Sequence, residues 1–387
     1  MFADLAEQLR KREQQGLRRT RQIVGSPQAS HVTIDGCDYL AFSSNDYLGL
    51  ANHPELIASA CDGARLYGIG AGASHLINGH SAAHHDLEAA LAAFTGFPQA
   101  LLFSTGYMAN IGMVTALAGR EDAVFADKLN HASLNDAALL SRAQFIRYPH
   151  CDLAALEQRL ATVQARRKLV ISDAVFSMEG DIAPIRRLIA LCERYHAWLL
   201  LDDAHGFGVL GEQGRGSLFL SKNAHSHSPN LVYMATLGKA AGVSGAFVAA
   251  QPEVIETLIQ SARSYIYTTA TPPLLAHALL TSVRLIEQDE WRREALRRNI
   301  AQLKQGLQSS PWKLLPSVTP IQPLLIGDSV EAVRISQGLR EQGMLVPAIR
   351  PPTVPQGTAR LRISLSATHQ PDDIQHLVRA LHDLAPS

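Results

Sequence analysis

Short hydrophobic runs alternate with longer amphipathic stretches over the first two thirds of the chain. The runs are apolar on both faces and end at turn residues, which is typical of strands in a parallel sheet covered by helices. The expected strands are 100–104, 169–173, 198–203, 231–236 and 245–249. The expected helices lie near 82–94, 106–118, 153–162 and 184–196. This alternation predicts an α/β fold with a mostly parallel sheet flanked by helices.

A smaller α+β unit is expected after a charge-rich helical stretch from about 275 to 307. It consists of further apolar runs and a last amphipathic helix, at 322–326, 344–347, 360–365 and 371–384. We therefore predict three parts. An N-terminal segment (1–50) packs with the small domain, a large domain covers 51–285, and the small C-terminal domain covers 286–387.

The charge balance excludes two classes of partner. The 387 residues contain 35 Lys+Arg and 35 Asp+Glu, so the chain has no net positive field to hold nucleic acid or an anionic membrane. No segment reaches the roughly 18 consecutive apolar residues of a membrane span, and the N-terminus lacks an export signal. Four scattered cysteines, without metal or disulfide spacing, favour reduced thiols in a cytoplasmic protein.

Two features lie at the predicted carboxyl ends of strands, where open α/β sheets bind their ligands. Gly106 opens a helix directly after a strand, and such a helix N-terminus binds phosphate, although an ordinary strand–helix turn is equally compatible. Asp202 and Asp203 end another strand and could bind magnesium in a nucleotide hydrolase. That alternative needs a GxxxxGK[ST] loop, and Tyr233 stands where its first glycine would be. The hydrolase hypothesis is therefore rejected.

Lys239 is the third feature. Among the seven lysines it alone lies between small and apolar residues just after a strand. A buried lysine is costly unless it loses its charge, as it does in a Schiff base, whereas a surface position is the alternative. With Asp202 to keep a pyridine nitrogen protonated and Gly106 for a phosphate, the set predicts a site for pyridoxal 5′-phosphate. His205 could face the same ring, and Ser177 and Thr236 supply hydroxyl groups nearby.

Two other patterns are interpreted as non-cofactor features. The glycine-rich stretch 68–74 lacks a preceding strand and the GxGxxG spacing, so it is predicted as a substrate loop rather than a dinucleotide site. Two groups of histidines lack Cys or Asp partners at metal spacing, and we interpret them as surface residues. They are His80, His84, His85, His225 and His227. No metal site is predicted.

Five motifs stand in order along the chain: Asn45–Leu50, Phe176–Asp181, Asp202–Gly206, Gly211–Gly216 and Thr236–Lys239. Together they resemble the α-oxoamine synthases, which are fold type I pyridoxal-phosphate-dependent transferases with a large and a small domain. These enzymes condense an amino acid with an acyl thioester and release CO2. The resemblance runs in family order from about residue 36 to the C-terminus.

Residues 348–355 and 357–362 are most similar to the biotin-pathway branch of this family. That similarity implies L-alanine and a pimeloyl thioester as substrates, with the acyl group on acyl carrier protein or on coenzyme A. A sibling synthase that uses glycine, such as glycine C-acetyltransferase, is the alternative. A non-catalytic partner subunit would lack the lysine, and the presence of Lys239, Asp202 and His131 argues against it.

The resemblance also implies roles for individual residues. Lys239 forms the Schiff base and removes the Cα proton, and Asp202 binds the pyridine nitrogen. The ring oxygen is contacted by His205 and Ser177, and His131 stacks on the ring and polarises the thioester carbonyl. The phosphate is held by Gly106, Tyr107 and Thr236.

Substrate contacts and a subunit interface follow from the same resemblance. Arg362 binds the carboxylate of the amino acid, for which a guanidinium fork is suited, and the other implied substrate contacts are Arg18, Asn45 and Thr353. Thr268 lies in a segment that reaches the phosphate of a neighbouring subunit, which implies a homodimer with shared sites. One departure is His75, where many relatives have an arginine, so the contact to the acyl group differs there.

Overall fold

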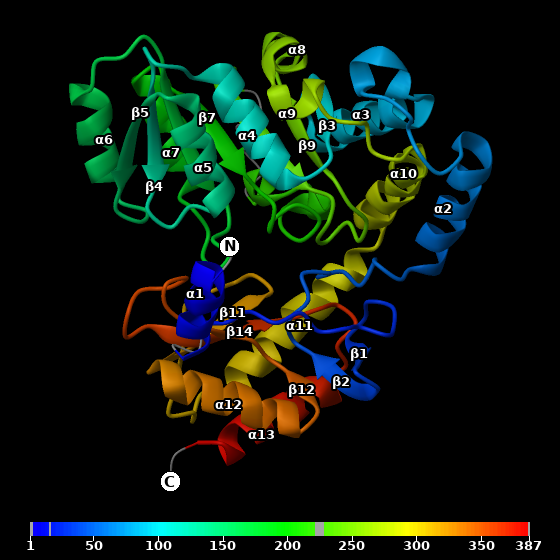
Figure 1. Cartoon of the computed structure of the whole chain (residues 1–387), viewed down its shortest axis with the longest axis vertical. Helices are drawn as coiled ribbons and strands as arrows, with labels where there is room; N and C mark the ends of the chain where they lie inside the picture. The colour runs from blue at the N-terminus through cyan, green and yellow to red at the C-terminus, as the bar shows by residue number, and fades with distance from the viewer. Residues whose placement is uncertain (1–2, 15–16, 221–227, 386–387) are drawn as a thin grey trace.

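A seven-stranded sheet forms the centre of the larger part of the molecule (Figure 1). The computed structural model describes residues 3–14, 17–220 and 228–385. In spatial order the strands are β3 (Gln99–Phe103), β9 (Ala246–Ala250), β8 (Leu231–Thr236), β7 (Trp198–Asp202), β6 (Lys168–Asp173), β4 (Ala123–Asp127) and β5 (Gln144–Tyr148). Strand β9 is antiparallel to β3 and β8, and the other pairs are parallel. The predicted mostly parallel α/β fold is confirmed.

Helices cover both faces of this sheet because successive strand residues point to opposite sides. Leu200 lies in a core cluster with α4, α5 and α8, whereas Leu199 and Leu201 pack in the cluster with α3, α6, α7 and α10. The helices of this part are α2 (Pro54–Tyr67), α3 (Ala82–Thr95), α4 (Gly106–Leu117), α5 (Ala132–Ser141), α6 (Leu153–Thr162), α7 (Ile185–Arg194), α8 (Pro252–Ser261), α9 (Arg263–Ile266) and α10 (Pro273–Gln288). Short helical turns occur at His75–Gly79 (η1), Glu212–Gly214 and Ser217–Phe219.

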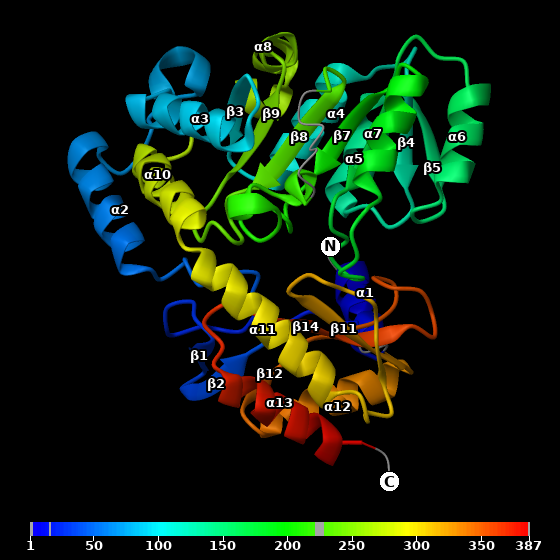
Figure 2. The ribbon, with the colours of Figure 1, turned by 180° about the vertical axis from the view of Figure 1, so that it is seen from behind.

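The second part contains a four-stranded antiparallel sheet in the order β10-β11-β14-β13 (Figure 2). The helices and strands of this second part are α11 (Glu290–Gly306), β10 (Lys313–Leu314), β11 (Ile321–Gly327), α12 (Ser329–Glu341), β12 (Met344–Leu345), β13 (Ala348–Ile349), β14 (Ala359–Ser364) and α13 (Pro371–Asp383). The helical stretch expected over 275–307 is helical, but it consists of two helices, α10 and α11, that meet at Asp289, whose backbone is not helical. Arg292 is buried there and donates to Asp289 and to the Leu48 carbonyl, which holds the break in place.

The N-terminal residues pack with the C-terminal ones. Helix α1 (Ala3–Gln14) is followed by β1 (His31–Ile34) and β2 (Cys37–Ala41), and β2 pairs in parallel with β12. The predicted boundary at 285/286 falls in the last turn of α10, three residues before that helix ends. The division into 1–50, 51–285 and 286–387 remains a proposal.

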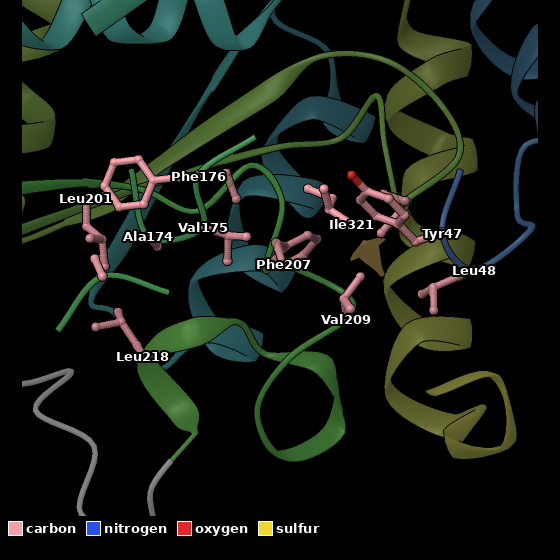
Figure 3. Packing of buried hydrophobic residues seen from close by; sticks show 14 of the residues in the cluster. Tyr47, Leu48, Ala174, Val175, Phe176, Leu201, Phe207, Val209, Leu218 and Ile321 are labelled. Carbon is pink, nitrogen blue, oxygen red and sulfur yellow. The ribbon is translucent and has the colours of Figure 1, made fainter. Parts of the chain in front are cut away.

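One buried cluster joins the two parts (Figure 3). It includes Val175 and Phe176, which follow β6, together with Phe207 and Tyr47. Ile321, the first residue of β11 in the small sheet, belongs to the same cluster. The turn after β6 is therefore packed against the C-terminal part by hydrophobic contacts as well as by the hydrogen bonds described below. Every helix in the described ranges is too short or too polar to cross a membrane.

Candidate active site

A cavity of about 200 Å³ opens at the carboxyl ends of the central strands. Parallel strands end at the same edge of a sheet, so the turns after β3, β4, β6, β7 and β8 converge there. The cavity is lined by Gly106, Tyr107, Asn110, His131, Ser133, Asp173, Asp202, Ala204, His205, Met234, Thr236 and Lys239. Most of the residues predicted to act in catalysis or to hold the cofactor are among them.

Lys239 is half-buried in the cavity, three residues after the end of β8. Its Nζ lies 2.9 Å from His205 Nε2, and within the described residues no ion pair reaches it. Burial lowers the pKa of Lys239 to about 8, and this effect outweighs the opposite influence of Asp202 and Asp173. A buried amine that is partly neutral near neutral pH is suited to nucleophilic attack on a carbonyl.

His205 links this lysine to the first sequence motif. Tyr47 OH donates to Asn45 Oδ1 at 3.1 Å, so its oxygen accepts from His205 Nδ1 at 2.7 Å. Nε2 of the same ring is then left as the acceptor for Lys239. Burial lowers the pKa of His205 well below its usual value, which agrees with a neutral ring. The sequence motif contained Tyr47, but its position between Asn45 and His205 was not predicted.

Asp202 ends β7 and is oriented by two donors. Its Oδ2 accepts from Asn110 Nδ2 at 2.7 Å and its Oδ1 from the Ala204 N–H at 2.9 Å. Asn110 Nδ2 also donates to Ser133 Oγ, while its buried Oδ1 has no hydrogen-bond partner. A buried unpaired oxygen costs about 1–3 kcal/mol, so Asn110 Oδ1 is an unsatisfied acceptor in the cavity wall.

Asp173 is a cavity residue that sequence reasoning missed. It pairs in register with Asp202 on the adjacent strand, and its Oδ2 accepts the His131 N–H at 2.6 Å. Burial and the neighbouring Asp202 charge raise the pKa of Asp173 well above its usual value. Only its place at the end of a buried strand could have indicated it.

His131 caps helix α5 at the rim of the cavity. Its Nδ1 accepts the Ser133 N–H at 3.2 Å and lies 2.7 Å from Ser133 Oγ, which orients the ring. Burial lowers the pKa of His131, so the neutral ring is favoured. A neutral, fixed ring is suited to stacking on a planar ligand, which is the role the sequence resemblance implied.

The first turn of α4 forms another part of the cavity wall and supplies an anion site there. Thr105 caps this helix through the Met108 N–H, and Gly106 and Tyr107 follow it at the cavity wall. The first N–H groups of a helix have no partner within the helix and attract anions. Thr236 closes this side, with its Oγ1 3.0 Å from the Gly245 carbonyl.

Arg362 lies next to this cavity on β14 and is buried. Its Nε donates to the Ser177 carbonyl at 2.6 Å, and its other nitrogens donate to Ser364 Oγ at 2.7 Å and to Asn45 Oδ1 at 3.3 Å. Through Asn45 and Tyr47 the guanidinium is connected to His205 and therefore to Lys239. The structure thus connects Ser177, Asn45 and Arg362 to Lys239 through hydrogen bonds.

Three predicted residues are not part of this network in the single chain. Arg18 is exposed and pairs with Glu13 at 2.8 Å. Thr353 is exposed, and its N–H donates to the Arg350 carbonyl. Thr268 is half-buried after α9, outside the cavity lining. Their roles remain predictions.

The interpretation of the histidines as surface residues is wrong for His84 and holds for His85. His84 is fully buried, accepts the Ser81 N–H through Nδ1 and bonds the Thr271 carbonyl through Nε2 at 2.8 Å. His75 is also buried, its Nδ1 lies 3.0 Å from Nδ1 of half-buried His80, and burial lowers the pKa of His75 to about 4. The His84 ring thus packs with Thr271, and the His75 ring stacks on Tyr265. His225 and His227 lie outside the described residues.

The residues present fit pyridoxal phosphate. The cavity is large enough for one substituted pyridine ring. It has an amine at one end, a helix N-terminus for a phosphate, and a carboxylate held by Asn110, whose own unpaired oxygen marks an unsatisfied polar position. This combination of amine, carboxylate and anion site is what an imine-bound, doubly charged cofactor requires.

Comparison with known proteins agrees with the site. Residues 38–381 match the family profile described as aminotransferase class I and II. The chain is 68% identical over 385 residues to 8-amino-7-oxononanoate synthase of Nitrosomonas eutropha, with 100% of both chains covered. It resembles the structure of SPT with PLP internal aldimine at a TM-score of 0.92 and 30% identity, covering 99% of this chain and 97% of that one. The structure of 8-amino-7-oxononanoate synthase from Francisella tularensis gives a TM-score of 0.77 and 31% identity, with 89% and 97% covered.

Proposed function

Because the chain belongs to the class I and II aminotransferases and, among them, to the 8-amino-7-oxononanoate synthases, we propose that it condenses L-alanine with a pimeloyl thioester and releases CO2. It is a pyridoxal-phosphate-dependent acyltransferase of biotin biosynthesis. The observation that carries the proposal is the buried Lys239 amine beside Asp202 and the guanidinium of Arg362, in a chain so similar to these synthases over its full length.

Several residues would hold the cofactor. Lys239 would bind it covalently, Asp202 would pair with the pyridine nitrogen, and His131 would lie against the ring. The first turn of α4 with Thr236 would take the phosphate, and His205 and Ser177 would take the ring oxygen. When bound, pyridoxal phosphate supplies an electron sink that stabilises a carbanion at the amino acid Cα.

The chain's own groups then act on the substrates. Arg362 would bind the alanine carboxylate through a charged fork, because it is buried and oriented by Ser177, Ser364 and Asn45. The neutral Lys239 amine would take the Cα proton, which its lowered pKa favours. His131 would donate a hydrogen bond to the thioester carbonyl as the new carbon–carbon bond forms. The carbon–sulfur bond of the thioester would break, the carrier thiol would leave, and the carboxylate that came from alanine would depart as CO2.

The uptake of cofactor is expected to depend on pH through Lys239. Below pH 8 the amine carries a proton and has no free electron pair to attack the cofactor aldehyde. The uptake rate of cofactor-free protein should therefore rise about tenfold per pH unit until about pH 8 and level off above it. Stopped-flow measurement of visible absorbance between pH 6 and pH 10 checks this. A rate that keeps rising toward pH 10.5, the usual pKa of a lysine, would contradict the assignment.

A substrate panel tests the proposed reaction. Holoenzyme is mixed with L-alanine or glycine and with pimeloyl-acyl carrier protein or pimeloyl-coenzyme A, and CO2 release is measured at steady state. We expect kcat/KM to be highest with L-alanine and a pimeloyl thioester. A preference for glycine and a short acyl group would instead assign the chain to a sibling such as glycine C-acetyltransferase. The two carriers are compared directly, and either result is compatible with the reaction.

We propose that the chain is a homodimer with sites at the subunit interface. Large apolar side chains are exposed on elements that contact one another in succession: Leu139 and Leu140 on α5, Tyr107 on α4, Tyr267 after α9 and Ile77 in η1. Exposed apolar side chains on neighbouring elements favour a protein–protein interface. Thr268 directly follows Tyr267 in the chain, and its contact with the neighbouring subunit stays a prediction.

The dimer is expected to dissociate when a charge is placed in this surface. Leu140→Glu should shift the sedimentation mass of the 42.0 kDa chain from dimer to monomer and weaken its hold on the cofactor. Val330→Glu is the matched control, because Val330 is similarly exposed but lies on α12. A wild-type protein that sediments as a monomer at micromolar concentration would contradict the proposal.

A further inference from the structure

The turn Phe176–Asp181 joins the central sheet to the small domain. On the small-domain side, Arg362 Nε donates to the Ser177 carbonyl at 2.6 Å and Arg360 donates to the Met178 carbonyl at 3.2 Å. Ser317 Oγ donates to the Gly180 carbonyl at 2.8 Å. The position of this turn therefore determines where the Arg362 guanidinium lies relative to the cavity.

On the sheet side, one histidine holds both ends of the turn. His150 Nε2 lies 2.9 Å from Asp181 Oδ2, and the ring contacts Phe176 edge-on with centroids 4.4 Å apart. His150 Nδ1 lies 3.1 Å from Oδ1 of Asp127, the last residue of β4. The turn itself is closed by the hydrogen bond from the Phe176 N–H to the Asp181 carbonyl at 3.0 Å.

Asp127, which His150 contacts on the β4 side, is held rigidly. Asp127 is buried, and its carboxylate also accepts the N–H groups of Leu129 and Cys151 at 2.8 and 2.7 Å. Asp127 is therefore tied to the end of β4, two strands away from β7 and Asp202. A hydrogen bond to such an anchor positions the turn more strictly than a bond to a mobile surface group.

Both ring nitrogens of His150 face carboxylates, so the ring is doubly protonated and charged. Burial lowers the pKa of His150, but the hydrogen bonds with Asp127 and Asp181 outweigh burial and raise that pKa to about 12. Glu179 is the other charged group on this turn besides Asp181, and it pairs at 3.1 Å with Arg360 of β14. The contacts of His150 with Asp127 and Asp181 therefore persist over the pH range in which enzymes work.

We propose that His150 is a positioning residue: by joining Asp127 to Asp181 it holds the turn Phe176–Asp181, and through Ser177 it determines where Arg362 takes the carboxylate of the amino acid substrate. This inference rests on the proposed function. His150 does not line the cavity, so it acts through the turn rather than on the reacting atoms. Replacing His150 is therefore expected to weaken amino acid binding and to leave cofactor binding unchanged.

A metal site at His150 is less consistent with the contacts of its ring. Asp127, His150 and Cys151 place possible metal-ligating atoms within 4.8 Å of one another. Both nitrogens of the ring are already engaged with Asp127 and Asp181, however, and Cys151 Sγ lies 3.7 Å from Nε2. A metal ion would have to replace the hydrogen bonds that hold the turn.

Spectral titration of the holoenzyme with L-alanine, without any acyl donor, tests the inference. Glutamine is neutral, and its single amide nitrogen cannot take the positions of both ring nitrogens, so His150→Gln should raise the alanine Kd about fivefold to tenfold and leave cofactor content unchanged. Asp181→Asn is the second variant, because Asp181 is one-third exposed and tolerates change better. It should raise the Kd in the same direction. His376→Gln on the exposed side of α13 is the control and should match wild type.

A double-mutant cycle with Arg362→Lys separates positioning from general destabilisation. If His150 acts through Arg362, the loss in the double variant should be clearly smaller than the product of the two single losses. The inference is overturned if the alanine Kd of both variants stays within about twofold of wild type, or if the variants lose cofactor rather than alanine binding. A wild-type protein that gives no spectral response to alanine would overturn the proposed function as well.

Discussion

Replacing Lys239 with alanine is expected to lower kcat by about 10⁴-fold or more and to abolish the visible absorbance of the bound cofactor. In the proposed mechanism the amine would serve both as the covalent attachment point and as the base for the Cα proton, and a positioned base alone contributes up to about 10⁴-fold. Lys239 is also the lysine that lies in the cavity. The change removes a buried amine without a carboxylate partner, so the variant should fold and its unfolding temperature should not fall.

The measurement compares purified Lys239→Ala with Lys313→Ala, whose side chain is exposed on β10. Both proteins are saturated with pyridoxal phosphate, and absorbance and CO2 release are recorded. Lys313→Ala should match wild type in both. If Lys239→Ala kept the absorbance band after excess cofactor was removed, the cofactor would be attached elsewhere and the site assignment would be wrong.

Asp202→Asn is expected to lower kcat by about 10²- to 10³-fold while cofactor is still bound. Asparagine keeps the shape of the side chain and the acceptor for the Ala204 N–H, but it removes the negative charge that, in the proposed mechanism, would keep the pyridine nitrogen protonated. Each unit by which that nitrogen's pKa falls corresponds to about 1.36 kcal/mol, so two to three units account for the expected loss. Steady-state kinetics at saturating substrate, normalised to bound cofactor, provides the test.

The neighbouring Asp203 is a matched control for this change. It is equally buried, but it accepts hydrogen bonds from Ser217 and Tyr233 and does not line the cavity. Asp203→Asn should lower the free energy of unfolding by about 1–3 kcal/mol with little loss of kcat per bound cofactor. Equal kinetic losses in both variants would contradict a direct role for Asp202.

The fold class was predictable from the sequence because it follows from local periodicity. Apolar runs such as 231–236 are too short for helices and have no polar face, so they indicated buried strands, and β8 spans the same residues. The break at Asp289 was not predictable from this pattern. Both sides of it are amphipathic and helical, and the break depends on the contact of Arg292 with the distant Leu48 carbonyl.

The catalytic residues were predictable to the extent that their residue type conflicts with their surroundings. Lys239 among small residues and Asp202 at the end of an apolar strand are such conflicts, and both line the cavity. Asn110 and Asp173 gave no comparable signal. Asn110 lies within an ordinary helix, and Asp173 was recognisable only once β6 was placed beside β7.

The sequence by itself determined the alternation of strands and helices, the lysine that can become neutral, and the family whose motifs surround it. The tertiary structure decided which distant groups meet. It placed Arg362 against Ser177, 185 residues earlier, buried His84 against Thr271, and connected Asp127 to Asp181 through His150. The reason is physical: hydrophobic periodicity reports the burial of each residue along its own element, whereas contacts between elements depend on strand order and on how two domains pack.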